Sequence, residues 1–449
     1  MRGDTTAMTN HCTHESDKNA AADYTPLVTN PGREVVVALE ARAAGWDIGG
    51  GHKALDGWSY NGITPGPTIE ARQGDTLVVR LTNRLDEPTT IHWHGLRLQP
   101  AMDGTESVQQ AVAPGEAFEY RFALPDAGTF WYHPHANETV QLERGLYGVL
   151  VVHGPDEPQV DAERVLVFDD VRLDWRGRLA GPGGWLERHN GREGRVPLLN
   201  GRVRPELEMA AGQVERWRLV NTASARYVRF SLGGAPFRII GTDGGLIEAP
   251  VDATEVLLAP ADRVDLLVGP FEESQRLDIQ SLEYNRGLGV KGTAVTFGTV
   301  RVGLSRRSVA RISEKLRTID PIAPPDAPVT REVRLGGRMS LRRGVDFMVN
   351  DEPHHHGQPV RVGELQVWDV INETPLDHPF HLHGFFFQVL AVNGEAPAYR
   401  SWEDTVNVPP KGRVKIAWMP DDRPGAWMAH CHILEHHAAG MMMHFEVVR

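Results

Sequence analysis

One pattern of residues occurs three times in this chain, at intervals the size of a domain. Its copies run from Asn61 to Asn83, from Asn200 to Asn221 and from Asn350 to Asn372, each with a proline and then a glycine between the asparagines. The glycine always precedes the second asparagine by nine residues, and the second asparagines lie 138 and then 151 residues apart. A repeat this long is too large for a solenoid unit. In a chain of 449 residues it predicts three units built on one plan.

The repeated units are predicted to consist of β-strands. Short runs rich in β-branched residues, among them Glu34–Leu39, Thr76–Leu81 and Val264–Val268, are bounded by glycine, proline, aspartate or asparagine. Many short strands of this kind predict sandwiches or barrels. Helical periodicity is scarce: Ser308–Leu316 is the best candidate for a helix, and Gly177–Gly194 is predicted to be a long surface loop.

The composition excludes several classes of protein. Lysine plus arginine number 47 and aspartate plus glutamate 59, and the resulting net charge of −12 argues against a nucleic-acid partner or an anionic membrane surface. No apolar run approaches the length of about 18 residues that a membrane span needs. Two cysteines exclude a disulfide scaffold. The first 23 residues contain no apolar core that would indicate an intact signal peptide.

Eight of the twenty histidines form four His-x-His pairs. These pairs are His92/His94, His133/His135, His381/His383 and His430/His432. On a strand, residues i and i+2 point to the same face, so each pair presents two imidazoles to one side. The first pair follows Asn83 by nine and eleven residues, and the third pair follows Asn372 by the same two intervals. The second and fourth pairs each follow a glycine, Gly128 or Gly425, by five and seven residues.

The matched pairs predict a single metal site between the first and third units. Eight neutral imidazoles are costly to bury together without cations between them. A set rich in imidazole and poor in thiolate suits copper, iron, nickel or zinc better than magnesium or calcium. The second unit has Phe230 and Leu232 at the matching positions, so no site is predicted there.

Cys431 indicates that the metal is copper. On a strand its sulfur faces away from the flanking His430 and His432. His436 lies five residues downstream of the cysteine, and Met441 lies five residues beyond that. Thiolate, imidazole and a weak thioether are three of the four ligands of a blue-copper centre.

The second imidazole of this centre must come from elsewhere in the chain. His378, three residues before His381 and directly before a proline, is the natural candidate. Met442 and Met443 adjoin the axial position, but the spacing favours Met441, and the other two are predicted to pack.

Four segments together resemble the copper motifs of the multicopper oxidases, most closely those of three-domain bacterial laccases. They are His92-Trp93-His94-Gly95, His133-Pro134-His135, the run from His378 to Gly384, and His430-Cys431-His432 with His436 and Met441. The resemblance implies an all-β fold of three cupredoxin-like Greek-key β-sandwich domains. The predicted boundaries are a tail over 1–32, domains over 33–156, 157–305 and 329–449, and a linker over 306–328.

The resemblance also implies four copper ions. Position by position, type 1 copper would take His378, Cys431, His436 and Met441, and type 2 copper would take His92 and His381. One type 3 copper resembles a site of His94, His133 and His432, and the other a site of His135, His383 and His430. The type 2 and type 3 ions would form a trinuclear cluster between the first and third domains.

An enzyme of this family couples two reactions. The type 1 site accepts electrons singly, with His436 resembling the solvent-edge ligand through which donors act, and the trinuclear site reduces dioxygen to water. The resemblance therefore predicts a laccase, a copper-dependent oxidoreductase that uses dioxygen to oxidise phenols or aromatic amines. Because copper enzymes of this family usually work outside the cytoplasm, an extracytoplasmic location, periplasmic or secreted, is expected.

Two alternatives stay open on the sequence. A metal-ion oxidase would oxidise cuprous, ferrous or manganous ions at the same copper sites. The chain lacks the methionine-rich insert of copper-efflux oxidases, with eleven methionines in all. A non-enzymatic copper carrier or a relative without sites is disfavoured, because the full ligand set is present.

Protons must also reach the trinuclear site. Asp103 matches the family's acidic residue near the type 2 and type 3 coppers, with an Asp-Gly turn as the alternative interpretation. Many bacterial relatives carry a glutamate directly after the second type 1 histidine, where this chain has His437. Glu435 or His437 itself is the predicted replacement.

Two further groups look like metal ligands. His354-His355-His356 could pick up copper, but a solvated hairpin turn is the preferred interpretation. His11-Cys12-Thr13-His14 lies in the tail, where no fold would preorganise it, so no site is predicted there.

Overall fold

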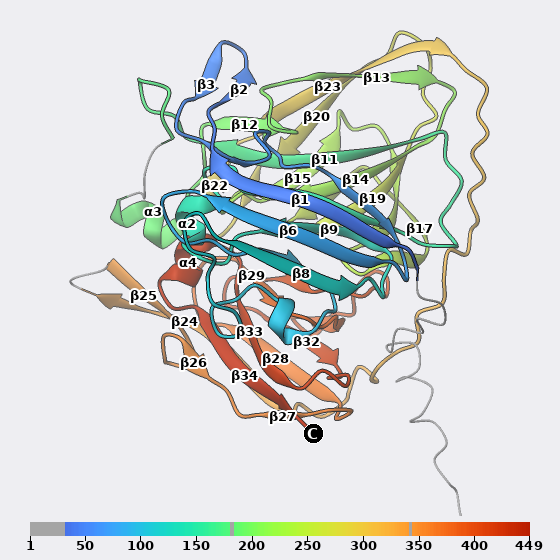
Figure 1. Ribbon diagram of the computed structural model, residues 1–449. Helices are drawn as coiled ribbons and strands as arrows, with labels where there is room; N and C mark the ends of the chain where they lie inside the picture. The colour runs from blue at the N-terminus through green and yellow to red at the C-terminus, as the bar shows by residue number, and fades with distance from the viewer. Residues whose placement is uncertain (1–31, 180–183, 341–343) are drawn as a thin grey trace, which may run out of the picture.

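The computed structural model describes residues 32–179, 184–340 and 344–449, and its regular structure is almost entirely β-strand. An all-β fold was predicted. Six large sheets form three pairs, and each pair belongs to one repeat unit (Figure 1). Within the described ranges, no helix has the length and apolar character needed to cross a membrane. The tail predicted over 1–32 falls almost wholly outside these ranges.

The first unit is a sandwich of two four-stranded sheets. One sheet has the order β4-β1-β6-β8 and the other β5-β10-β9-β7. The strands are β1 (Glu34–Ala43), β4 (Trp58–Tyr60), β5 (Ile69–Arg72), β6 (Thr76–Arg84), β7 (His92–His94), β8 (Ala117–Ala123), β9 (Gly128–His133) and β10 (Gly148–His153). A hairpin of β2 (Trp46–Gly49) and β3 (His52–Ala54), the 3-10 helix η1 (Pro100–Met102) and the short helix α2 (Glu138–Gln141) complete the unit.

The second unit pairs a six-stranded with a five-stranded sheet. Their orders are β12-β11-β14-β19-β16-β17 and β13-β23-β20-β15-β18. The elements are β11 (Ala162–Val171), α3 (Trp185–Asn190), β12 (Val196–Leu199), β13 (Glu206–Ala211), β14 (Glu215–Asn221), β15 (Val228–Leu232), β16 (Phe237–Thr242), β17 (Gly245–Ala253), β18 (Glu255–Leu258), β19 (Arg263–Val268), β20 (Arg276–Leu282), β21 (Tyr284–Asn285), β22 (Lys291–Gly292) and β23 (Val295–Ser305). Phe230 and Leu232 are fully buried in its apolar core.

The third unit repeats the sandwich with five and six strands. One sheet has the order β25-β24-β28-β32-β30, and in the other β26-β34-β33-β29-β31 is extended by β27, which pairs with β34. The elements are β24 (Arg331–Ser340), β25 (Gly344–Val349), β26 (His355–His356), β27 (Val360–Arg361), β28 (Gln366–Asn372), β29 (His378–Leu382), β30 (Gln388–Val392), β31 (Thr405–Val408), β32 (Arg413–Trp418), β33 (Gly425–Cys431), α4 (Leu434–Ala438) and β34 (Met442–Val448).

The first asparagine of each repeat joins two strands of its unit. Asn61, Asn200 and Asn350 adopt positive φ angles of 57°, 51° and 49°. Asn61 accepts a hydrogen bond from Glu40 N and donates one to Ala38 O, and the other two asparagines make the equivalent bonds. Asparagine tolerates this backbone region and can bond locally, which explains why the repeat keeps it.

The second asparagine of each repeat is buried where a strand ends. The Asn83 side chain accepts from Leu85 N and donates to Glu87 O and Val112 O. Asn221 and Asn372 make the same three kinds of bond in their units. Each asparagine satisfies backbone groups at a turn that no ladder reaches, so the repeat seen in the sequence is a repeated structural device.

We propose the domain boundaries 33–156, 157–305 and 329–449, since every strand of one pair of sheets lies inside one of these ranges. The helix expected over Ser308–Leu316 does not form. Its backbone is extended and bonds other segments instead, with Val309 N donating to Asp161 and Leu316 N donating to Glu248 O. These long-range partners override a weak helical periodicity. Residues 180–183 of the predicted loop over Gly177–Gly194 lie outside the described ranges, and the described part contains the short helix α3.

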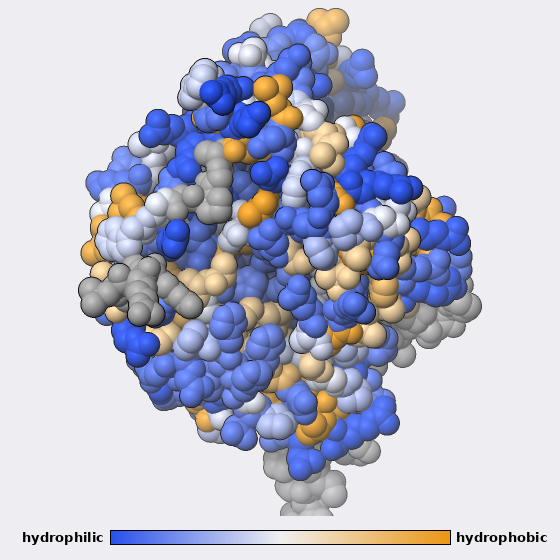
Figure 2. Space-filling model, turned by 60° about the vertical axis from the view of Figure 1, so that its left-hand side comes forward, coloured by the Kyte–Doolittle hydropathy of each residue, from blue (hydrophilic) through white to orange (hydrophobic). Residues whose placement is uncertain are grey.

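Charged groups fix the second unit against β9. Thr129 of β9 donates to Asp265 at 2.8 Å, and Arg218 donates to the Thr129 hydroxyl at 3.0 Å. Glu157, the first residue of the second domain, pairs with Arg216 at 2.8 Å and with Arg218 at 3.1 Å. Figure 2 shows the surface on the side of the molecule where α3 lies. This surface is mainly hydrophilic, and its hydrophobic side chains form small separated patches. Apolar side chains of the two units also pack together, among them Val149 of the first with Val167 and Val220 of the second, so the interface combines buried polar contacts with an apolar cluster.

The Glu157 ion pairs predict a pH-dependent contribution to stability. Burial alone would raise the pKa of Glu157, but Arg216 and Arg218 lower it from the usual 4.5 to about 2. Its contribution is therefore complete above about pH 4.5 and is lost as the pH falls towards 2. We expect Glu157→Gln to cost about 1–3 kcal/mol of stability at pH 7 and clearly less at pH 3. Thermal unfolding of the metal-free protein at both pH values measures this, and an equal penalty at both would contradict it.

Candidate metal centre

The four His-x-His pairs meet between the first and third units. In the first unit β7 supplies His92 and His94, and His92 lies opposite His133 at the end of β9. In the third unit β29 supplies His381, which lies opposite His430 on β33. The same antiparallel pairing in both units aims both sets of imidazoles at the space between them.

Three groups of imidazoles bring their ligand atoms within 4.8 Å of one another. They are His94 with His133 and His432, His135 with His383 and His430, and His92 with His94 and His381. The His94 and His381 rings stack at 3.7 Å, and the His92 and His383 rings stack at 4.0 Å, so the two units meet directly through their histidines.

Seven ring nitrogens in this cluster are buried and have no hydrogen-bond partner among the described residues. They are Nε2 of His92, His133, His135 and His381, Nδ1 of His94, and both ring nitrogens of His432. Buried polar atoms are rarely left without partners, because each costs about 1–3 kcal/mol. Unpaired imidazole nitrogens that converge on one space are the donor set that copper binds. The residues present therefore fit a copper cluster.

In four of the eight rings, those of His92, His133, His381 and His430, the Nδ1 atom is held by a backbone carbonyl. His133 Nδ1 donates to Pro134 O at 2.9 Å, and His430 Nδ1 donates to Cys431 O at 3.0 Å. A hydrogen bond of this kind sets the tautomer and leaves the other nitrogen free for a metal. The backbone thus orients these four imidazoles before any ion binds.

Asp103, directly after η1, contacts a histidine from each unit. Its carbonyl accepts from His92 Nδ1 at 2.8 Å, and its carboxylate accepts from His383 Nδ1 at 2.9 Å. Burial lowers the pKa of His92, but Asp103 more than offsets this, and the pKa lies above its usual value. The predicted acidic residue therefore lies at the cluster, where it orients two ligands.

Asp404, which the sequence analysis missed, does the same from the third unit. Its carbonyl accepts from His381 Nδ1 at 3.0 Å, and its carboxylate accepts from His94 Nε2 at 3.0 Å. Burial alone would raise the pKa of Asp404, but Arg263 of the second unit, 2.9 Å away, holds it well below its usual range. Each aspartate thus binds the first histidine of its own unit and the second histidine of the other.

A second group of ligands lies around Cys431. Its Sγ atom is 3.4 Å from His378 Nδ1 and 3.6 Å from His436 Nδ1, and these two nitrogens are 3.1 Å apart. The opposite nitrogens are engaged: His378 Nε2 lies 2.7 Å from the Thr374 hydroxyl, and His436 Nε2 donates to His189 O at 3.0 Å. A cysteine sulfur with two imidazoles in this arrangement fits the donor set of a blue-copper site.

Met441 lies beside this group, with its carbonyl accepting from Cys431 N at 3.0 Å. Its side chain is fully buried in the same apolar cluster as the cysteine. Burial raises the pKa of the Cys431 thiol well above its usual value. A bound cation would reverse that shift, because a coordinating thiol is deprotonated.

His436 is covered, which differs from the solvent-edge position that the resemblance implied. Its side chain has no exposed surface. The Phe347 ring lies 4.0 Å from its ring, and α3 from the second unit places the His189 carbonyl on Nε2. Helices α2, α3 and α4 gather at this side of the molecule (Figure 1).

Glu435 lies away from the histidine cluster. Its carboxylate accepts from Arg192 N at 3.2 Å and lies 3.6 Å from Arg192 Nε, in the loop after α3. His437 is on the cluster side, with its ring stacked at 4.2 Å on that of His430. Of the two predicted replacements for the missing glutamate, only His437 contacts the cluster.

Glu138, the first residue of α2, supplies the carboxylate that the sequence analysis did not locate. One of its oxygens lies 2.6 Å from His437 Nδ1, and the other lies 3.3 Å from His133 Nδ1. Burial alone would raise the pKa of Glu138, but the imidazoles of His135 and His437 hold it well below its usual value. Its position three residues after His135 was the available indication.

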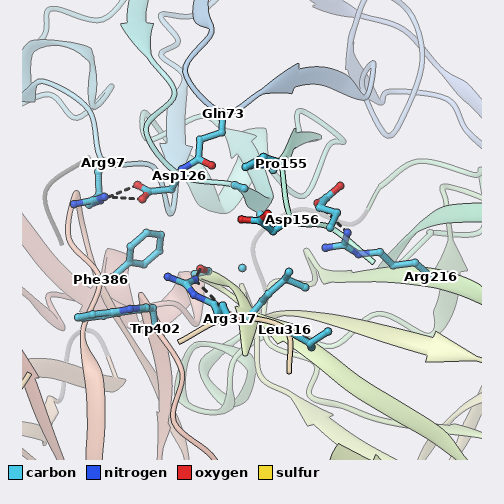
Figure 3. A pocket seen from close by; sticks show the side chains of 17 residues that line it. Gln73, Arg97, Asp126, Pro155, Asp156, Arg216, Leu316, Arg317, Phe386 and Trp402 are labelled. Carbon is cyan, nitrogen blue, oxygen red and sulfur yellow. Dashed lines mark hydrogen bonds and ion pairs between the residues drawn. The ribbon is translucent and has the colours of Figure 1, made fainter. Parts of the chain in front are cut away.

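A separate cavity of about 220 Å³ opens where the three units meet. Figure 3 shows Arg97 and Asp126 paired on one side and Arg216, Leu316 and Arg317 on the other. Its lining within the described residues contains neither histidine nor cysteine. Trp402, two residues before Asp404, also lines it, so the cavity adjoins the support of the cluster without holding its ligands.

The comparisons with known proteins agree with this geometry. Family profiles described as multicopper oxidase match residues 46–157, 180–278 and 324–449. The multicopper oxidase MmcO of Mycobacterium tuberculosis is 32% identical over 93% of this chain and 88% of that protein. The structure of a Campylobacter jejuni multicopper oxidase, described as a metallo-oxidase, aligns with a TM-score of 0.82 at 30% identity over 92% of this chain and 91% of that one.

A laccase of Botryotinia fuckeliana is 28% identical over 86% of this chain and 78% of that protein. The chain therefore belongs to the multicopper oxidase family, whose members are copper oxidoreductases with oxygen as acceptor. Its three sandwiches are cupredoxin-like, as predicted.

The support that Asp404 gives to His94 and His381 predicts weaker metal retention in its absence. We expect Asp404→Asn to lower the copper affinity of the histidine cluster about 10- to 100-fold, because an amide binds both the imidazoles and Arg263 less strongly. Copper per chain after dialysis against a chelator measures this. Asp369→Asn is the matched control, since Asp369 of β28 pairs with Arg413 of β32 and contacts none of the cluster histidines in the described contacts. Equal retention in both variants would contradict the role.

Proposed function

We propose that this multicopper oxidase is of the laccase type, with four copper ions. One-electron oxidation of phenols and aromatic amines at a type 1 copper would supply four-electron reduction of dioxygen to water at a trinuclear copper cluster. The ligands would be the sets carried over above: His378, Cys431, His436 and Met441 for type 1, His92 and His381 for type 2, and two histidine triads for type 3. We also propose an extracytoplasmic location, because copper enzymes of this family usually work outside the cytoplasm.

The observation that carries this proposal is the set of seven unpartnered ring nitrogens together with the Cys431 group. Cys431 lies between His430 and His432 in the sequence. A few covalent bonds of the chain therefore connect the Cys431 group to the histidine cluster. His430 and His432 face the cluster, whereas the cysteine sulfur faces His378 and His436. This arrangement supports electron passage from one group to the other.

Helix α3 offers a surface for aromatic donors. Trp185 is 51% exposed, and its ring stacks on that of His189 at 5.8 Å and 26°. The His189 carbonyl accepts from His436 Nε2. A phenol held against Trp185 would therefore be separated from His436, a proposed type 1 ligand, only by His189 and its hydrogen bond to that ligand.

A second candidate function, metal-ion oxidation, is favoured by the covering of His436. Since this side chain has no exposed surface, a bulky ring has no direct contact with it. A small cation could approach the site by another route. The relative described as a metallo-oxidase supports the same candidate.

Glu138 and His437 are proposed to carry protons toward the cluster, together with Asp103. The Glu138 carboxylate bridges His437 and His133, and His437 is 7% exposed. His437 occupies the sequence position directly after His436, where many bacterial relatives carry a glutamate, and Glu138 supplies a carboxylate beside it.

Cys431→Ser tests the type 1 assignment. Serine is nearly isosteric, so we expect the fold and its thermal midpoint to stay within a few degrees, while the blue absorption band and oxygen uptake with 2,6-dimethoxyphenol are lost. Oxygen electrode and visible spectra measure this on copper-loaded protein, with ferrous and cuprous salts as alternative donors. A serine variant that keeps full activity would overturn the proposal.

Glu138→Gln tests the proton route. We expect turnover with phenol to fall about 100-fold, as for loss of a positioned acid–base group, while the blue band is kept. Glu435→Gln is the matched control, because Glu435 faces Arg192 and not the cluster. A similar loss in both variants would count against the assignment to Glu138.

A further inference from the structure

The histidine triplet at 354–356 is built into the third sandwich and is more than a solvated turn. Strand β26 runs parallel to β34, with His355 opposite Met443 and His356 opposite His444. His354 precedes this strand at a φ of 54°, a left-handed conformation that non-glycine residues seldom adopt. Its N–H donates to Gly440 O at 3.0 Å. The turn is thereby fixed to the segment that carries Met441.

The His354 side chain contacts a thioether. Its Nδ1 atom lies 2.7 Å from Met442 Sδ. A thioether is only a weak hydrogen-bond acceptor, so the contact gains little for either group. Imidazole and thioether are, however, both ligands for soft monovalent copper. His354 is exposed, whereas Met442 is only 8% exposed, so a cation from solvent would meet the imidazole first.

Two more imidazoles flank this pair. His356 and His444 stack with ring centroids 5.5 Å apart, and both line a surface hollow of about 480 Å³. Because side chains alternate along β34, Met442 and His444 share one face. His354 contacts Met442 and His356 stacks on His444, so both imidazoles lie on that same face. His355 points elsewhere, with Nδ1 on Glu352 at 3.1 Å.

We propose that His354 and Met442, flanked by His356 and His444, form a binding site for a soft monovalent cation. Cuprous ion would bind there as a substrate of the oxidase. The thioether sulfur favours cuprous ion over manganous ion, which prefers oxygen ligands. As a substrate site, the proposal rests on the second candidate function above.

The position of the site suits electron delivery. Met442 directly follows Met441, whose carbonyl accepts from Cys431 N. Each bound cuprous ion would lose one electron and leave as a cupric ion. Four such electrons, with one dioxygen and four protons, give two water molecules. Electrons would reach the type 1 group from the side of Met441 and would not pass through the covered His436.

Silver(I) is a redox-inert probe for the site. We expect copper-loaded protein to bind one further equivalent of silver, with at least tenfold weaker binding in His354→Ala and in Met442→Leu. All variants carry Cys12→Ser, because that thiol would bind silver itself. His355→Ala is the matched control from the same triplet and should bind silver as tightly as the parent. Absence of the extra equivalent, unchanged binding in both site variants, or an equal loss in His355→Ala would overturn the proposal.

Oxygen uptake separates this site from the proposed function. We expect His354→Ala to lower the ratio of cuprous to phenol turnover at least fivefold, and silver to compete with cuprous ion. An unchanged ratio would overturn the substrate role. A protein that binds silver through His354 but consumes no oxygen with any donor would contradict the proposed function and leave the cation site standing.

Discussion

The burial of eight imidazoles facing one another is the constraint on which the rest of this structure depends. Unpartnered polar atoms in an interior oppose folding, and here they converge on one space. The protein manages this by fixing the opposite ring nitrogens with carbonyls and with Asp103 and Asp404. Metal ions would remove the remaining cost, so metal binding and the association of the first and third units are coupled.

The second unit contributes support and access without ligands. Arg263 keeps Asp404 ionised beside two imidazoles, and Arg218 and Asp265 hold the strand that ends in His133. Helix α3 covers His436. The second unit, which has Phe230 and Leu232 in place of a histidine pair, thus supports the geometry of the histidine cluster and covers His436 of the Cys431 group.

The histidines could be predicted from the sequence because strands alternate with a fixed period of two and the repeat supplied a common frame. Asp404 could not, although it mirrors Asp103: Asp103 follows His94 by nine residues, whereas Asp404 follows His383 by twenty-one. The longer loop of the third unit hides the equivalence. The contact of Glu138 with His437 and the cover of His436 by α3 join segments that are distant in sequence, so local patterns gave no sign of these two contacts. The same holds for the segment over Ser308–Leu316, whose long-range bonds displaced the expected helix.

Copper-edge anomalous diffraction from crystals of the copper-loaded protein tests the central claim most directly. We predict one peak enclosed by His378, Cys431 and His436, and further peaks inside the cluster lined by the seven unpartnered ring nitrogens. A copper-loaded crystal with no peak in that cluster, or with copper only at the surface, would contradict it.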